Sequence, residues 1–300
     1  MLRMRLAAKP FSRLARNDQR TFFSSVLVIL FQASLSNRSK IFRFDHDDFI
    51  EAVNVAGRIA SPPCELSIHQ FVALFSSEKG WPVEILISTP RSKLWIIVGK
   101  GDAQYEFRLI TKPFLSADEG RSVTKLHDAT PEIVRRFALS DEQAALARIR
   151  YNRLVDIFCK CVAHSLQNHL RTKVTGIGQI EIDELYVGAN RQGEHFIIPV
   201  QAKKKRDRLG VSQLMQDLEY CRVAHPDLRP RALGAQLLKH HEDGKVFDKI
   251  VLFEFECRDE PNDVIIRKRA ERHFVLLPHG EITASDFKEA HDRQEDADND

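Results

Sequence analysis

Three polar side chains in the second half of the chain have the types and spacing that phosphodiester chemistry requires. Asp183 lies in the run 179–188, and Gln201 and Lys203 lie near the end of the run 195–203. Because side chains alternate along a strand, Gln201 and Lys203 share one face, and Asp183 joins them if the two runs pair as a hairpin. The sequence therefore predicts that a carboxylate, an amide oxygen and an ammonium group meet at one end of a sheet.

This combination suits metal-assisted cleavage of a phosphodiester. Mg²⁺ or Mn²⁺ prefers oxygen ligands, and we expect Asp183 and Gln201 to supply two of them. The metal would acidify the attacking water and offset charge at phosphorus. Lys203 would orient that water and stabilise the pentavalent state. The alternative is that Asp183 and Glu181 are solvent-facing strand residues and that Lys203 begins an ordinary exposed turn.

The predicted elements around these residues follow a definite order. The capping-box spacing of residues 140–143, in which Ser140 and Gln143 are the capping side chains, opens a helix predicted to extend to about residue 170. Cys159 and Cys161 would then point to different faces of this helix. The remaining elements complete an α-β-β-β-α-β order with one added strand. They are a short strand near 171–174, the two hairpin strands, a helix over 209–221 and apolar runs at 231–238 and 249–257.

These residues in this order resemble the PD-(D/E)XK nuclease superfamily, which includes restriction enzymes and Holliday-junction resolvases. Asp183 matches the family's aspartate on the second strand, and Lys203 matches the lysine of its (D/E)-x-K motif. Gln201 stands where the family usually has Asp or Glu, which leaves one fewer negative charge at the metal. The helix residues 216–220 are similar to the Q-x-x-x-Y element of the exonuclease branch. The resemblance covers about residues 140–257 and implies an α/β (α+β), restriction-endonuclease-like fold and a Mg²⁺-dependent DNA endonuclease.

A basic run follows the predicted lysine directly. Residues 203–208 contain five basic side chains, and such a run contacts phosphates without reading base sequence. The usual alternative is a solvated loop. The candidate nucleic-acid contacts are Lys204, Lys205, Arg206 and Arg208, and the candidate helix-borne supports of metal or phosphate are Asp156, Gln213 and Gln216.

The rest of the chain divides by composition and pattern. Residues 1–40 carry eight basic side chains and one acid, which fits a targeting segment, a basic arm or a surface helix. We expect residues 41–139 to form a small α+β domain of unknown role and residues 140–283 to form the nuclease-like core. We expect residues 284–300 to form an acidic disordered tail. Within the small domain we expect helices over 45–60 and 69–75 and strands over 83–88, 93–98 and 105–110.

Length and composition describe an ordinary globular chain of two domains. It has 300 residues, 43% hydrophobic and 29% charged, with a net charge of +3, which excludes collagen-like and disulfide-framework classes. The five cysteines form no C-x-x-C pair, so we expect a reducing, cytoplasmic location. No apolar run reaches the length of a membrane span. The sequence leaves open DNA versus RNA, homodimer formation, and a rival function as an inactive DNA-binding module with the same fold.

Overall fold

The chain divides into two units of mixed α and β structure. The computed structural model describes residues 19–36, 42–58, 67–75, 81–101, 104–112, 114–118, 120–137, 142–174, 178–204, 207–260, 263–278, 281–286 and 288. The first unit comprises Met1–Pro113, Thr175–Gly178 and Arg258–Ile265, and the second comprises Phe114–Val174, Gln179–Cys257 and Ile266–Asp300. The expected boundary between residues 139 and 140 lies inside the second unit.

The first unit packs helices against a small antiparallel sheet. Phe31 is buried with its ring centroid 5.0 Å from that of Trp95 and 5.3 Å from that of Phe107, so an aromatic cluster forms the centre of this core. β3 lies between β1 and β2, and Asp263 pairs with the end of β3. The elements are α1 (Gln19–Ser36), β1 (Phe42–Phe44), α2 (His46–Gly57), α3 (Ile68–Phe75), α4 (Val83–Leu86), β2 (Leu94–Gly101) and β3 (Gln104–Ile110).

The strand predicted over 83–88 is wrong, because this segment forms α4. Only Ile85 of the run is buried, whereas Val83 and Ile87 are exposed, so the burial lacks the two-residue period of a strand. Pro82 precedes α4 with an extended backbone, and its fixed φ is compatible with a helix start. The other predicted helices and strands of this unit are present, and an Asp45–Asp48 capping box begins α2.

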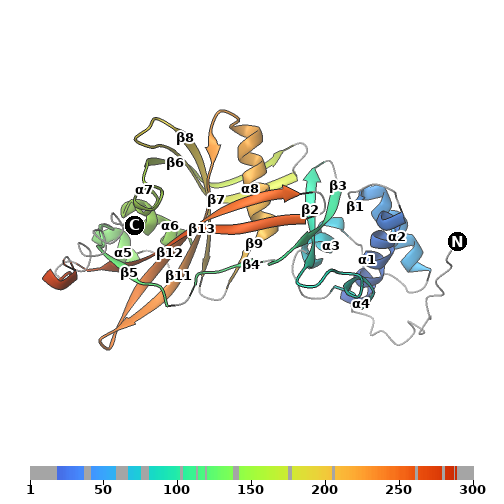
Figure 1. Ribbon diagram of the computed structural model, residues 1–300, viewed down its shortest axis with the longest axis horizontal. Coiled ribbons are helices and arrows are strands. Elements are labelled where there is room, and N and C mark those ends of the chain that lie inside the picture. The colour runs from blue at the N-terminus through green and yellow to red at the C-terminus, as the bar shows by residue number, and fades with distance from the viewer. Residues whose placement is uncertain are drawn as a thin grey trace. The chain divides into compact units, whose positions relative to one another are not determined.

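The second unit is built on a mixed sheet whose strands lie in the order β13-β12-β11-β8-β7-β6 (Figure 1). β7 is antiparallel to β8, β8 is parallel to β11, and β11 is antiparallel to β12. Strand bounds are β4 (Phe114–Leu115), β5 (Val123–His127), β6 (Val162–Val174), β7 (Gly178–Ala189), β8 (His195–Lys204), β9 (Leu209–Gly210), β10 (Arg229–Pro230), β11 (Ala232–Glu242), β12 (Lys245–Glu260) and β13 (Asp263–Leu277).

Helices cover both faces of this sheet. Leu146 of α6 (Glu142–Tyr151) and Val155 of α7 (Leu154–Cys159) join one core with Val200, from the face of β8 that also carries Ile198 and Ala202. α8 (Val211–Ala224) packs on the opposite face, where its Asp217 reaches Gln201 (Figure 1). The predicted alternation of β8 is therefore confirmed. α5 (Glu132–Phe137) is a short surface helix.

The long helix predicted from residue 140 to about 170 is wrong. The chain leaves helical geometry at Arg153 (φ 52°) and again at Lys160 (φ 51°), and β6 follows. Cys159 and Cys161 lie on either side of this second turn, and both are buried. The expected Ser140 cap lies outside the described residues. No helix in the described part of the chain is long and apolar enough to cross a membrane.

Candidate active site

The site begins where β7 and β8 separate. Regular pairing between these strands ends at Glu184 and Val200. Beyond that point side chains bridge the strands: the Ala202 N–H donates to Asp183 Oδ2 at 2.8 Å, and Gln201 Nε2 donates to the Glu181 carbonyl at 2.8 Å. These bonds satisfy backbone groups that the ladder no longer pairs, and they fix two of the predicted side chains.

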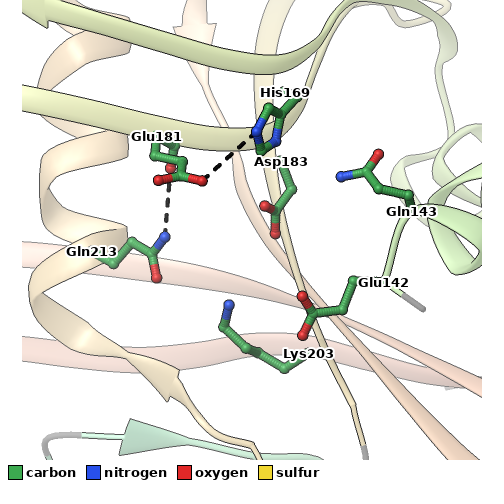
Figure 2. A pocket seen from close by; sticks show the side chains of 7 residues that line it. All are labelled: Glu142, Gln143, His169, Glu181, Asp183, Lys203 and Gln213. Atoms are coloured by element: carbon green, nitrogen blue, oxygen red, sulfur yellow. Dashed lines mark hydrogen bonds and ion pairs between the residues drawn. The ribbon is translucent and has the colours of Figure 1, made fainter.

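A cavity of about 450 Å³ lies at this divergence (Figure 2). Asp183 of β7 and Lys203 of β8 both line it, so the structure brings together the carboxylate and the ammonium of the predicted site. Gln213 reaches it from α8. The lining residues that the structure describes are Glu142, Gln143, His169, Glu181, Asp183, Lys203 and Gln213.

The charges in this cavity divide into paired and available groups. Glu181 accepts from Arg171 Nη2 at 2.8 Å and lies 3.9 Å from His169 Nε2. Glu142 and Lys203 make no ion pair within the described part of the chain. With one Asp183 oxygen bound to the Ala202 amide, its second oxygen, the Glu142 carboxylate and the Lys203 ammonium are the groups available to a ligand.

Gln201 lies behind the cavity rather than in its wall. It is fully buried, its Oε1 accepts from Gln213 Nε2 at 3.0 Å, and its Nε2 also donates to Asp217 Oδ2 at 2.9 Å. This geometry differs from the expectation that Gln201 supplies a metal ligand, because its oxygen is already bound to Gln213. Its two donated bonds and one accepted bond instead connect β7, β8 and α8 directly beneath the cavity.

Asp217 is the buried end of this network. Burial raises the pKa of its carboxyl well above the usual value, and the nearby Asp183 charge raises it further, whereas the Gln201 hydrogen bond and the Lys203 charge lower it. Sequence reasoning missed Asp217, although it lies four residues after Gln213 and so on the same helix face. That spacing was the available signal.

The remaining predicted residues that the structure describes do not line the cavity. Asp156 accepts from the Ala163 N–H at 3.0 Å and pairs with Arg153. Gln216 is partly buried on α8 and does not line the cavity. Lys204 lines a different hollow, and the Arg208 guanidinium lies over the Phe114 ring at 5.6 Å. Lys205 and Arg206 lie outside the described residues.

Two lining residues come from segments that the sequence assigned to the long helix. Glu142 occupies the first turn of α6. His169 lies in β6 with φ 52°, a left-handed conformation that is uncommon for any residue except glycine. Its side chain points towards Glu181 (Figure 2). Such strained positions cluster at functional sites, but no sequence pattern marks them.

The oxygen donors of the cavity fit a hard divalent cation. Carboxylates are the side chains that Mg²⁺ prefers, and it is usually held by one or two of them together with water and phosphate oxygens. Asp183 and Glu142 would serve as these ligands. Among the described residues, no group of three His, Cys, Asp or Glu side chains is arranged to hold a metal by itself.

No protein-family model, curated protein or solved structure matches this chain. Function is therefore inferred from the chemistry of the cavity.

Proposed function

We propose that the protein is a Mg²⁺-dependent nuclease of the PD-(D/E)XK type that hydrolyses phosphodiester bonds in DNA. The observation that carries this proposal is that Asp183 and Lys203 line one cavity at the end of the β7–β8 hairpin. The order α6/α7-β6-β7-β8-α8-β11, with β8 parallel to β11, also supports it, since a helical crossover between parallel strands is the arrangement expected of such a core.

The chain's own residues have distinct parts in this proposal. Asp183 and Glu142 would hold Mg²⁺ or Mn²⁺, which when bound acidifies water and offsets phosphate charge. Lys203 donates hydrogen bonds to the attacking water or to a non-bridging phosphate oxygen and stabilises the charge that develops there. Gln213 of α8 donates a hydrogen bond to Gln201 Oε1. Gln201 and Asp217 act behind them by fixing the separation of the two strands.

A non-catalytic nucleic-acid-binding module is the second candidate. The specific observation in its favour is Gln201, which replaces an acidic residue of the family motif and whose oxygen is bound to Gln213. Only two carboxylates without an ion pair, Glu142 and Asp183, then line the described cavity. Such a module would bind nucleic acid equally well with and without divalent metal.

The test is cleavage by the purified full chain. Supercoiled plasmid, single-stranded DNA and RNA of matched length are incubated with Mg²⁺, with Mn²⁺ or with EDTA. We expect metal-dependent cleavage of DNA and none in EDTA, because a carboxylate–lysine site needs the cation to offset phosphate charge. RNA cleaved in preference to DNA would change the substrate class. Binding without cleavage under every metal condition would favour the module.

A further inference from the structure

A second hollow opens at the same end of β8 as the candidate active site. Its volume is about 660 Å³, within the range of small-molecule sites. Apolar side chains from three strands line it, among them Leu237 of β11, Phe247 of β12 and Leu276 of β13. Basic side chains also line it, among them Arg148, Lys204 and Lys239. The hollow therefore combines an apolar surface with cationic groups.

The two hollows share the same structural elements. Lys203 lines the first and Lys204 lines the second, and because neighbouring side chains on a strand point to opposite faces, the end of β8 separates the two spaces. α6 also lines both, with Glu142 of its first turn in the first hollow and Arg148 of its last turn in the second. A chain of linked phosphates that reaches Lys203 can therefore continue past the strand end to Lys204.

The charge of the second hollow suits an anion. Among the described residues, four basic side chains and two acids line it: Arg135, Arg148, Lys204 and Lys239, and Asp128 and Asp248. Arg148 is bound to both acids, at 3.2 Å and 2.6 Å, and Lys239 pairs with Asp248. Arg135 pairs with Glu132. Lys204 makes no ion pair within the described residues, so its ammonium is available to a phosphate.

We propose that this second hollow holds an unpaired nucleotide of the nucleic-acid substrate, next to the phosphate that is cleaved. The base lies against Phe247 and the neighbouring apolar side chains, and the adjoining phosphate binds Lys204. A base still paired in a duplex cannot enter a hollow, so the substrate must carry a single-stranded or splayed strand at this position. The inference rests on the proposed function, because it assigns a substrate structure to the same enzyme.

The test is a binding measurement without metal, so that it does not depend on cleavage. Fluorescence anisotropy in EDTA compares a blunt duplex with the same duplex carrying a single-stranded extension at either end. Because stacking of one base on an aromatic ring contributes a factor of roughly five or more, the extended duplex should bind at least that much more tightly.

Phe247→Leu keeps the apolar volume but removes the aromatic face, and should lose most of this advantage without changing affinity for the blunt duplex. Phe247→Trp should retain it. When single bases are removed from the extension one at a time, the natural protein should lose affinity at one position, because only the base at that position contacts the Phe247 ring. Phe247→Leu should lose no affinity at that position.

Lys204→Gln tests the phosphate contact. It should lower the slope of log affinity against log salt by about 0.7 for the extended substrate. Lys245→Gln removes the same charge at the start of β12 and should leave the slope unchanged.

The inference is overturned if blunt and extended duplexes bind equally, or if Phe247→Leu weakens both to the same extent. Failure of the nuclease proposal is a separate result. A protein that prefers the extension in EDTA but never cleaves with metal keeps the second hollow and loses the catalytic assignment. A protein that binds blunt and extended DNA equally and cleaves with metal keeps the catalytic assignment and loses the second hollow as a nucleotide site.

Discussion

Gln201→Glu is the substitution that best distinguishes a structural role of Gln201, as a hydrogen-bonded support, from the metal-ligand role that the sequence predicts. It introduces the acidic residue of the motif that the sequence resembles, with almost no change in shape. In the structure, however, Gln201 Nε2 donates hydrogen bonds to the Glu181 carbonyl and to Asp217 at 2.8 Å and 2.9 Å. A carboxylate cannot donate either bond, so the buried Asp217 carboxyl loses this donor, and the Glu181 carbonyl keeps only the longer bond from Gln213 Nε2 at 3.5 Å.

The expected loss of stability follows from these hydrogen bonds. A buried acceptor left without a donor costs about 1–3 kcal/mol, so the loss at Asp217 should lower the free energy of unfolding by about this amount. The pKa of Asp217 is already raised by burial, and the new carboxyl group can share its proton at low pH. Both groups bind more protons in the folded state than in the unfolded state, so the deficit grows as pH rises.

The assay is urea unfolding of both proteins at several pH values. Gln201→Glu/Asp217→Asn should recover much of the loss, because an amide at position 217 can donate to the new carboxylate. Gln216→Glu makes the same chemical change on α8 outside the network, and should remain within about 0.5 kcal/mol of the natural protein. A Gln201→Glu variant that is fully stable and needs less Mg²⁺ for cleavage would refute this reasoning and make Gln201 a metal ligand.

Two further predictions concern the same region. The stability of the natural protein in urea unfolding should fall as pH rises above about 4, the usual Asp pKa, because burial raises the pKa of Asp217 in the folded protein. Asp217→Asn should lack this part of the pH dependence. Asp227→Asn, at an exposed position, should keep it. Gly234→Ala should destabilise by about 1–3 kcal/mol, since its added Cβ would overlap Leu209 Cδ1 and Phe253 Cε2; an unchanged urea midpoint would contradict the close packing beside Gln201.

The positions of Asp183 and Lys203 could be predicted because they depend on a local rule. The strands expected over 179–188 and 195–203 match β7 and β8 within one residue at each end. The two-residue period then fixes which side chains share a face. Both residues accordingly line one cavity.

The environment of Gln201 could not be predicted from its strand. Parity places it on the same face as Lys203, but its burial and partners are decided by Gln213 and Asp217 on α8. Whether a strand residue faces an open cavity or the underside of a helix depends on where that helix crosses the sheet. No local sequence pattern specifies that crossing.

The error over residues 140–170 has a similar origin. Apolar residues at steps of three and four continue through Val162 and Leu166, yet both side chains are more than half exposed. Their spacing therefore reflects no buried helix face. The chain changes direction at Arg153 and Lys160, in left-handed conformations that non-glycine residues adopt only when tertiary packing stabilises them. His169 was lost from the expected site for the same reason.

The most direct test of the central claim is single-turnover cleavage of DNA by Lys203→Met in saturating Mg²⁺. Methionine keeps the length of the side chain and removes the ammonium that lines the cavity. Loss of one group that stabilises developing charge slows such reactions about 100- to 1000-fold, and we predict a loss of this size with DNA affinity and the urea midpoint nearly unchanged. Lys245→Met, which removes an ammonium outside the cavity, should cleave as the natural protein does. A cleavage rate in Lys203→Met equal to that of the natural protein would contradict the account.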